Sequence, residues 1–171
     1  ADLRGQTGVA IDVLPADLTK ADELAAVERR LQADADIGIL VNNAGIVRDR
    51  MFVSATVEEW DATMHVHLRG HFCIARHAVN YWRAKQKEGR DPDARIINTS
   101  SGAGLQGSIA QAAYATAKGG IASLTLVQAA ELGRYGITAN ALAPSARTRM
   151  TEPAFAEKMA TQGTAFDAMD P

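Results

Sequence analysis

The sequence has 171 residues, of which 47% are hydrophobic and 22% are charged, a composition typical of one globular domain with its own core. Its net charge of −2 provides no basic surface for nucleic acid, so we expect no nucleic-acid partner. No apolar run approaches the roughly 18 residues of a membrane span, and the first residues lack a signal-peptide pattern, so we expect no membrane association.

The first part of the chain contains two apolar runs and one helical pattern between them. Residues 9–14 (VAIDVL) are rich in β-branched side chains and predict a strand. Thr19 can cap a helix that continues to about Ala33, because its apolar residues recur at helical spacing. Residues 37–42 are almost continuously apolar, which is the pattern of a parallel strand buried on both faces.

A long helical pattern follows this second strand. Thr56 and Glu59 are spaced as a capping box, which marks the start of a helix. The apolar periodicity after them predicts that this helix continues to about Lys87, with a bend at Gly70. A polar connector with a proline then separates it from the next apolar run.

The remaining elements repeat the alternation of strand and helix. Residues 94–99 and 137–142 predict strands, and residues 111–133 predict a helix rich in small side chains. Strands that alternate with helices predict an α/β fold, with a Rossmann-like parallel sheet and helices on both faces. We treat residues 1–171 as a single, partial domain of this kind.

The strongest chemical signal lies between the last two strands. Tyr114 and Lys118 are four residues apart, so on a helix they lie on one face. General acid–base catalysis works best when the acting group titrates near the operating pH, and a free phenol titrates well above it. An ammonium at about 4 Å favours the phenolate by about 4 kcal/mol at an effective dielectric of about 20. Ser101, thirteen residues before Tyr114, would lie where strand meets loop, with its hydroxyl free for a substrate oxygen.

This arrangement of serine, tyrosine and lysine resembles the short-chain dehydrogenase/reductase family. In that family the serine orients the substrate carbonyl or hydroxyl, and the tyrosine transfers the proton. The lysine favours the phenolate and holds the nicotinamide ribose. The resemblance therefore implies an enzyme that uses NAD or NADP, with these three catalytic roles on Ser101, Tyr114 and Lys118.

Two other patterns match known motifs in spacing but not in context. Tyr81 and Lys85 repeat the Tyr-x-x-x-Lys spacing, but Leu68 stands thirteen residues before Tyr81, so this pair lacks the serine. We interpret it as the polar end of a packed helix. The glycines of residues 102–107 have the spacing of a dinucleotide fingerprint, but no helix opens directly on them, so we reject that interpretation.

The resemblance also implies where a dinucleotide binds. Asn42-Asn43-Ala44-Gly45 matches the family's Asn-Asn-Ala-Gly motif, whose small residues let the backbone approach the cofactor ribose while its asparagines tie neighbouring strands together. An aspartate and an aliphatic residue after the first strand resemble the family's adenine contact; the alternative is that the aspartate is only a turn residue. A Pro-containing segment with a threonine beyond it resembles the family's contact to the nicotinamide carboxamide. The implied cofactor-binding residues are Asp17, Leu18, Asn43, Ala44, Gly45, Tyr114, Lys118, Ala146 and Thr148.

Histidines are concentrated on the helix predicted from Thr56 to Lys87. His67 and His71 are four residues apart, but no third ligand at a suitable spacing accompanies them, so we expect no metal site. In much of the family, position 67 is an asparagine whose main-chain carbonyl helps to hold a water on the lysine. Such a backbone role survives a change of side chain.

The substrate class is suggested by three segments. Residues 42–52, 66–70 and 143–151 look most like the dehydrogenase part of peroxisomal multifunctional enzyme type 2 and its bacterial relatives. This resemblance implies NAD-linked interconversion of a (3R)-3-hydroxyacyl thioester and its 3-oxo form. The alternatives are a 3-oxoacyl-acyl-carrier-protein reductase using NADPH, a dehydrogenase of another secondary alcohol such as a steroid or sugar, and a non-catalytic dinucleotide-binding fragment. The small-residue helix also implies a homo-oligomer, a dimer or tetramer.

Two features bear on completeness and compartment. The chain begins at Ala1 rather than Met, and the family's first βαβ unit with its Gly-rich phosphate loop, and its last strand, have no counterpart in the sequence. We therefore expect a fragment that does not turn over substrate by itself. Cys73 is the single cysteine, which excludes an internal disulfide and fits a reducing, cytoplasmic compartment.

Overall fold

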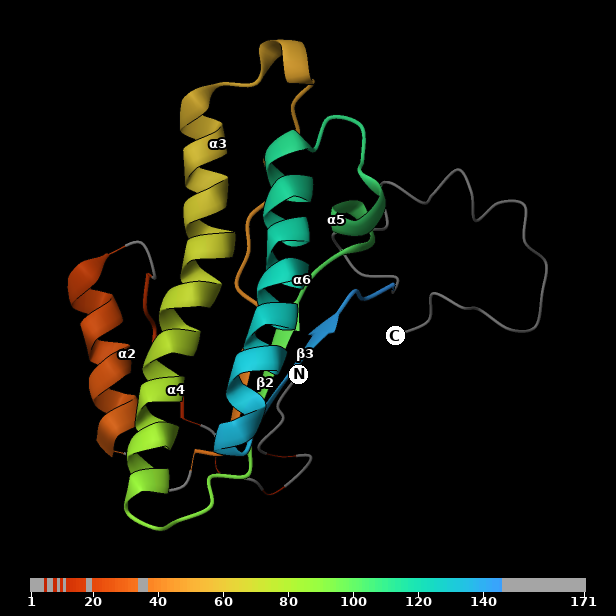
Figure 1. The fold of residues 1–171 in the computed structure, drawn as a ribbon. Coiled ribbons are helices and arrows are strands. Elements are labelled where there is room, and N and C mark those ends of the chain that lie inside the picture. The colour runs from red at the N-terminus through yellow and green to blue at the C-terminus, as the bar shows by residue number, and fades with distance from the viewer. Residues whose placement is uncertain are drawn as a thin grey trace.

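The computed structural model describes Gly5, Gly8, Ala10 and residues 12–17, 20–33 and 37–145. Its longer elements, in chain order, are α2 (Ala21–Ala33), β1 (Ile39–Asn42), α3 (Val57–Met64), a π-helical turn (His65–Arg69), α4 (Gly70–Lys87), β2 (Ala94–Thr99), α5 (Gly102–Gln106), α6 (Ala112–Leu132) and β3 (Ile137–Leu142). Figure 1 shows these elements as a sheet beside a layer of long helices.

The three described strands form one parallel sheet in the order β1-β2-β3. Asn42, the last residue of β1, is paired with Asn98 near the end of β2, and Asn98 is paired with Ala141 near the end of β3. The carboxyl ends of all three strands therefore reach the same edge of the sheet. Parallel strands joined by helices are the arrangement that the sequence pattern predicts, and the Rossmann-like α/β class is confirmed.

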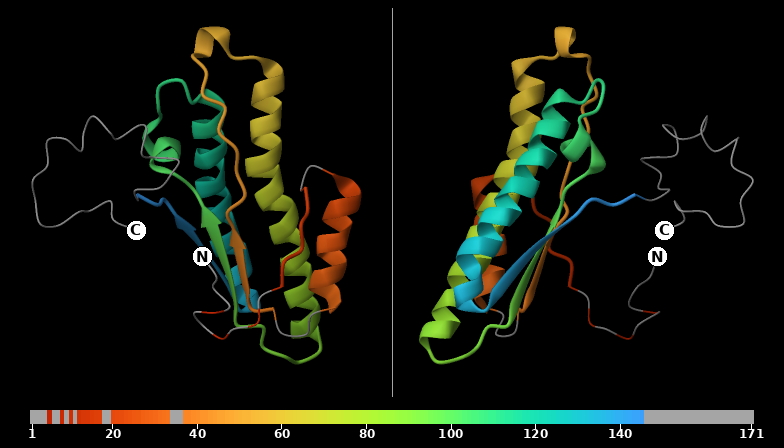
Figure 2. Two further views of the ribbon diagram at one scale, coloured as in Figure 1. Left: turned by 180° about the vertical axis from the view of Figure 1, so that it is seen from behind. Right: turned by 45° about the vertical axis from the view of Figure 1, so that its right-hand side comes forward.

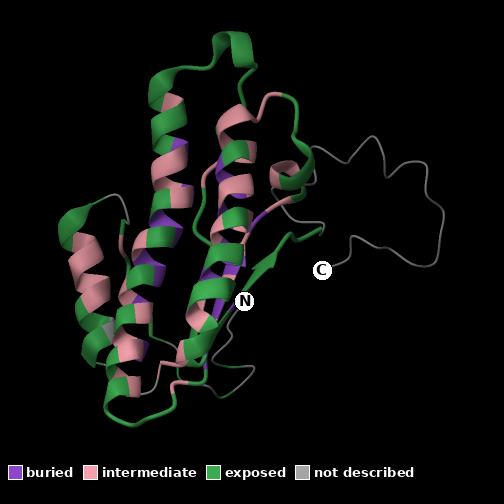
Figure 3. Ribbon diagram, in the orientation of Figure 1, coloured by how far each residue is buried: buried purple, intermediate pink, exposed green. Residues whose placement is uncertain are grey.

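One face of the sheet is covered by helices. Helix α4 contacts β1 and β2, α6 contacts β2 and β3, and α2 packs against α4 (Figure 2). Every second residue of β2 is fully buried under these helices, whereas Ile39 and Val41 of β1 are 61% and 59% exposed. Figure 3 shows buried segments where the long helices and the sheet face each other. Such alternation is typical of a sheet with one face covered. In the part of the chain that the structure describes, α4 and α6 both lie on this single face.

The core lies between α4 and the strands. Trp82 of α4 is fully buried against Ile96 of β2 and Ile137 of β3, and its indole nitrogen donates to the main-chain oxygen of Ile37 at 2.7 Å. Burying so large a side chain stabilises the fold, and the hydrogen bond removes the cost of burying its polar nitrogen. This contact fixes the entry of β1 against the helix layer.

The long helical pattern forms as predicted, with one addition. Thr56 accepts from the Glu59 main-chain nitrogen, and the Glu59 carboxylate accepts from the Thr56 main-chain nitrogen, so the capping box is confirmed. We expected a bend at Gly70; instead, a π-helical turn, His65–Arg69, precedes Gly70, and α4 continues from it. A π turn accommodates one extra residue and changes which side chains face the sheet.

The predicted first strand does not form in the residues that the structure describes there. Ala10 and residues 12–14 lie outside any strand, and Val13 is 79% exposed. A strand is stable only when its backbone groups have partners in a neighbouring strand, and β2 is the only described strand paired with β1. A β-branched composition is therefore not sufficient to form a strand at Ala10 and residues 12–14.

A buried polar network joins β1, β2 and α6. The side-chain amide of Asn42 donates to the side-chain oxygen of Asn98 at 2.9 Å. The Asn98 amide donates in turn to the Thr125 hydroxyl at 2.9 Å and to the Gln128 side-chain oxygen at 2.8 Å. Asn98 is fully buried, so all these groups depend on one another for partners. The prediction that an asparagine of the Asn-Asn-Ala-Gly motif ties neighbouring strands together is confirmed for Asn42.

We expect Asn98→Ala to lower the free energy of unfolding by at least about 2 kcal/mol, because the buried Asn42 amide and the Gln128 side-chain oxygen lose their Asn98 partner at about 1–3 kcal/mol each, while Thr125 keeps its bond to the Ile121 oxygen. Urea unfolding of the protein measures the loss. Asn80→Ala, at an exposed position of α4, is the matched control and should change stability by no more than about 0.5 kcal/mol. Equal effects of the two substitutions would contradict a stabilising role for the network.

Candidate active site

The carboxyl edge of the sheet brings the predicted catalytic residues toward one another. Thr99 ends β2, and the main-chain nitrogen of the following Ser100 donates to the Leu142 oxygen at the end of β3, at 2.7 Å. Ser101 then begins α5, and α6 returns past the same edge carrying Tyr114 and Lys118. Ligands of open parallel sheets bind at this edge, so the predicted site residues lie where such a fold favours ligand binding.

Lys118 is held at the base of the site. Its side chain is buried, its ammonium donates to the Thr99 main-chain oxygen at 2.6 Å, and it lies 5.7 Å from the centre of the Tyr114 ring. The Ser100 hydroxyl donates to the main-chain oxygen of Lys118 at 2.8 Å, which fixes the backbone as well. Burial lowers the pKa of Lys118 because the low-dielectric surroundings disfavour its charge. The Thr99 carbonyl offsets part of that cost.

Ser101 presents its hydroxyl at the start of α5. The hydroxyl oxygen accepts from the main-chain nitrogen of Ala103 at 3.2 Å, which caps this short helix. Because the cap uses only an acceptor site of the hydroxyl, its hydrogen is available for a substrate oxygen. The structure therefore places Ser101 in a position consistent with its predicted role.

Among the glycines of residues 102–107, Gly104 has a packing role. A β-carbon at Gly104 would lie 2.6 Å from the Gly119 nitrogen and 2.7 Å from the Lys118 β-carbon, and one at Gly119 would lie 2.8 Å from the Gly104 oxygen. Two glycines facing each other therefore let α5 approach α6 closely. This contact positions Ser101 relative to Lys118 and accounts for Gly104 without a dinucleotide fingerprint.

The loop after β1 lies against a buried histidine. Asn43, Ala44 and Gly45 are exposed, while the ring of His67 packs on Gly45 and Ile46 from the π-helical turn. The same ring meets the Tyr114 ring edge to face, with 5.3 Å between centres and 87° between planes. The sequence indicated only a backbone role for position 67. Its side-chain contacts depend on the π turn, which helical periodicity does not reveal.

The remaining predicted cofactor residues divide into two groups. Asp17 is exposed in the turn before α2, where its main-chain oxygen accepts from the Lys20 nitrogen at 3.0 Å and its carboxylate lies 3.9 Å from the Lys20 ammonium. These contacts fit the turn-residue alternative and leave the adenine contact a prediction. Leu18, Ala146 and Thr148 lie outside the residues that the structure describes.

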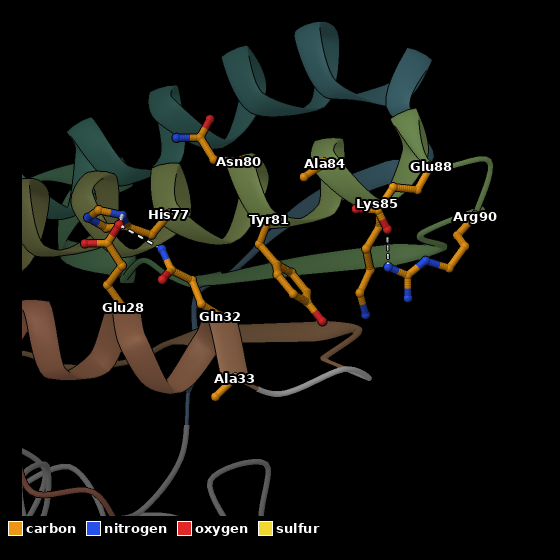
Figure 4. Close-up of a pocket in the computed structure, with 10 residues that line it drawn as sticks. All are labelled: Glu28, Gln32, Ala33, His77, Asn80, Tyr81, Ala84, Lys85, Glu88 and Arg90. Carbon is orange, nitrogen blue, oxygen red and sulfur yellow. Dashed lines mark hydrogen bonds and ion pairs between the residues drawn. The ribbon is translucent and has the colours of Figure 1, made fainter.

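The second Tyr-x-x-x-Lys pair lies at the end of α4, on a different helix from Tyr114. Tyr81 and Lys85 occupy the last turns of α4, which lead to the amino end of β2, and line a cavity of about 500 Å³ between α2 and α4 (Figure 4). The Lys85 ammonium lies 4.5 Å from the Tyr81 ring centre, a cation–π contact. This cavity is of ordinary size for a ligand site, but none of the described residues that line it is a serine, so it contains no counterpart of Ser101.

The part of the chain that the structure describes contains neither a candidate metal site nor a candidate membrane span. Within it, no three histidine, cysteine, aspartate or glutamate side chains are grouped so that they could hold a metal ion. None of its helices is both long enough and apolar enough to cross a bilayer.

Comparison with known proteins identifies the family. The model of the short chain dehydrogenase family matches residues 1–159. The chain belongs to the short-chain dehydrogenase family. The resemblance drawn from Ser101, Tyr114 and Lys118 is therefore confirmed, and the family supports nicotinamide dinucleotide binding without distinguishing NAD from NADP.

Two curated relatives are informative. Hydroxyacyl-CoA dehydrogenase ChsB1 of Mycobacterium tuberculosis is 49% identical over 153 residues, which are 88% of this chain and 47% of that protein. Peroxisomal multifunctional enzyme type 2 of Mus musculus is 39% identical over 159 residues, or 93% of this chain and 20% of that protein. The chain therefore spans less than half the length of either relative. The predicted likeness to the multifunctional enzyme is confirmed.

A solved structure shows the same fold around a cofactor. The short-chain dehydrogenase from Sphingobium yanoikuyae in complex with NADPH is 32% identical, with a TM-score of 0.76. The similarity covers 89% of this chain and 57% of that one. The chain described here therefore shares the Rossmann-like arrangement of the Sphingobium yanoikuyae structure over most of its own length.

A buried histidine near the site predicts acid sensitivity. Burial, with a smaller effect of the Lys118 charge, lowers the pKa of His71 from 6.5 to about 4. The unfolded chain therefore binds a proton that the folded chain does not bind between these pH values. We expect His71 to leave the free energy of unfolding unchanged above about pH 6.5. Below that pH its contribution is lost, and by pH 4 the free energy of unfolding should be lower by about 3 kcal/mol.

Unfolding of the parent and of His71→Gln at pH 7 and pH 4.5 measures this effect. The parent should lose more stability than the variant on acidification, because the variant has no imidazole to protonate. His65→Gln, one helical segment earlier, is the control and should behave like the parent. If His71→Gln loses as much stability as the parent, another group causes the acid sensitivity.

Proposed function

We propose that the protein is an NAD(P)-dependent oxidoreductase that interconverts a secondary alcohol and a ketone in a 3-hydroxyacyl/3-oxoacyl thioester. The observation that supports this most directly is the position of Lys118. Its ammonium is buried beneath the Tyr114 ring and held by the Thr99 carbonyl, while Ser101 lies at the end of the same strand. A protein that only bound a dinucleotide would have no need of all three groups.

The residues divide the reaction between them. The Ser101 hydroxyl donates a hydrogen bond to the substrate oxygen and fixes its orientation. In the oxidation direction, the Tyr114 phenolate accepts the hydroxyl proton of the alcohol; in reduction, the Tyr114 phenol donates that proton to the carbonyl oxygen. The Lys118 ammonium stabilises the phenolate in both directions. A bound nicotinamide dinucleotide supplies the hydride chemistry.

The chain's own residues fit such a cofactor. Asn43, Ala44 and Gly45 are exposed at the carboxyl end of β1, and their small size lets a ligand approach the backbone. Lys118 would hold the nicotinamide ribose, as in the family, because its remaining ammonium hydrogens are free to donate beyond Thr99. Thr148 and Ala146 would contact the nicotinamide end, and Asp17 and Leu18 the adenine end.

The thioester substrate is inferred from the names of the two curated relatives, a hydroxyacyl-CoA dehydrogenase and a peroxisomal multifunctional enzyme. Assays of the full-length gene product with 3-hydroxyacyl-CoA, with the same acyl group on acyl carrier protein, and with NAD and NADP distinguish the candidates. Turnover of the coenzyme A thioester with NAD supports the dehydrogenase assignment. A preference for the carrier-protein thioester with NADPH supports the reductase alternative.

We also propose that the protein self-associates through its helix layer. Phe72 of α4 and Leu126 of α6 are 50% and 73% exposed. An apolar groove lies between Leu124 of α6 and the segment from Met64 to Phe72. Its lining residues are Met64, His65, Leu68, Arg69, Phe72 and Leu124. An exposed apolar groove rimmed by polar residues is typical of a protein interface. Sedimentation of the full-length protein tests for a dimer or tetramer.

The decisive substitution is Tyr114→Phe, which removes only the hydroxyl. We expect turnover to fall by about 10²- to 10⁴-fold, because proton transfer in the transition state is lost, while the cofactor still binds. Steady-state kinetics of the full-length protein and a fluorescence titration with NADH measure the two effects.

Tyr81→Phe is the matched control, since Tyr81 belongs to a Tyr-x-x-x-Lys pair without a serine. It should leave turnover within about twofold of the parent. Near-parent turnover in Tyr114→Phe would overturn the assigned chemistry. A comparable loss in Tyr81→Phe would show that the other tyrosine acts.

A further inference from the structure

We propose that His67 is a positioning residue that joins the dinucleotide loop after β1 to the proton-transferring Tyr114. This inference rests on the proposed function and assigns a role to a side chain that the sequence pattern left without one. The imidazole contacts both partners at once, although they belong to segments far apart in the chain.

The first contact fixes the loop. His67 Nε2 lies 3.0 Å from the Ile46 main-chain nitrogen and 2.6 Å from the Ile46 main-chain oxygen. A neutral ring can hold this residue in either tautomer: Nε2 accepts from the N–H when it lacks the proton and donates to the carbonyl when it carries it. Burial lowers the pKa of His67, which keeps the ring neutral. Ile46 directly follows Gly45, so the hydrogen bond sets the path of the loop at which a dinucleotide would lie.

The second contact is the fit of the ring against Gly45. A β-carbon at position 45 would lie 2.4 Å from His67 Cε1 and 3.1 Å from Nδ1. Only glycine leaves room for the imidazole at this position. Gly45 therefore serves the histidine as well as the cofactor.

The third contact fixes the tyrosine. The His67 and Tyr114 rings meet at 5.3 Å and 87°, the edge-to-face geometry that aromatic pairs favour. Lys118 lies near the same Tyr114 ring, with 5.7 Å from its ammonium to the ring centre. His67 and Lys118 together restrict the orientation of the phenol, which would otherwise rotate with only α6 to hold it.

Stability alone does not account for a histidine here. The ring is 1% exposed, and its Nδ1 has no hydrogen-bond partner among the described residues. A buried polar nitrogen without a partner is unfavourable, and an apolar ring would avoid it. The π-helical turn that carries His67 is likewise less favourable than a regular helix and is frequent at functional sites.

Two substitutions separate the two halves of this role. His67→Phe keeps an aromatic edge for Tyr114 but cannot bond the Ile46 peptide group; His67→Gln can reach that group but has no ring. We expect His67→Phe to weaken NADH binding by about fivefold, the loss of one hydrogen bond, and His67→Gln to bind NADH within about twofold of the parent. His67→Gln should lower kcat by about fivefold or more, with the thioester KM within about twofold.

Ile137→Val, a core change at the amino end of β3, is the control for stability alone. It should lower the unfolding temperature while its NADH affinity and kcat, measured below the transition, match the parent. If His67→Phe and His67→Gln behave like Ile137→Val, His67 is only structural and the proposal is overturned. The fluorescence titration uses NADH alone, so it tests the loop contact even if the parent protein turns over no thioester, an outcome that would overturn the proposed function and not this contact.

Gly45→Ala supplies an independent test of the same contact. In the parent its methyl group meets the imidazole, and we expect NADH affinity to fall by about tenfold. In a His67→Ala background the ring is gone, and the same substitution should weaken binding by no more than about twofold. Equal effects in both backgrounds would show that Gly45 and His67 act independently and would overturn the proposal.

Discussion

The hydrogen-bond network centred on Asn98 is the constraint on which the rest of the site depends. It joins Asn42 at the end of β1, Asn98 in β2, and Thr125 and Gln128 in α6. The buried face of α6 combines the apolar Ala117 and Ile121 with the polar Lys118, Thr125 and Gln128, so hydrogen bonds as well as packing fix the helix on the sheet. Directed hydrogen bonds to one buried amide allow only one register. With that register set, Lys118 reaches Thr99 and the loop after β1 lies beside the amino-terminal part of α6.

Burial of the Lys118 ammonium is unfavourable for the stability of the fold. A buried ammonium is destabilising unless hydrogen bonds replace its water, and the Thr99 carbonyl provides one of them. The close approach of Gly104 to Gly119 brings α5 against the same turn of α6, and Ser101 follows from that packing. The positions of Ser101 and Lys118 therefore depend on main-chain contacts: Ser101 on the packing of α5 against α6, and Lys118 on the Thr99 carbonyl. These contacts use one acceptor site of the Ser101 hydroxyl and one hydrogen of the Lys118 ammonium.

Much of this arrangement is encoded locally and was predictable. The spacing of Ser101, Tyr114 and Lys118 depends only on a strand end and a helical period, so the sequence was sufficient to predict it. The β-branched composition predicted a strand over residues 9–14, whereas Ala10 and residues 12–14 lie outside any strand, because pairing depends on a partner strand and not on composition. The side-chain role of His67 was hidden for a different reason. The π turn at His65–Arg69 breaks the 3.6-residue period on which any assignment of helix faces depends.

The buried side chains of His67, His71 and Lys118 disfavour one another's protonation. Burial is the main reason why the pKa values of His67 and His71 are lowered, and the positive charge of Lys118 lowers both further. Because like charges at short range in a low dielectric repel strongly, protonation of either histidine would make the Lys118 charge less favourable. Neutral histidines therefore avoid a further lowering of the Lys118 pKa, which burial already lowers. A neutral His67 can also hold the Ile46 peptide group in either tautomer, so the burial that disfavours the histidine charge is compatible with the hydrogen bond to the loop after β1.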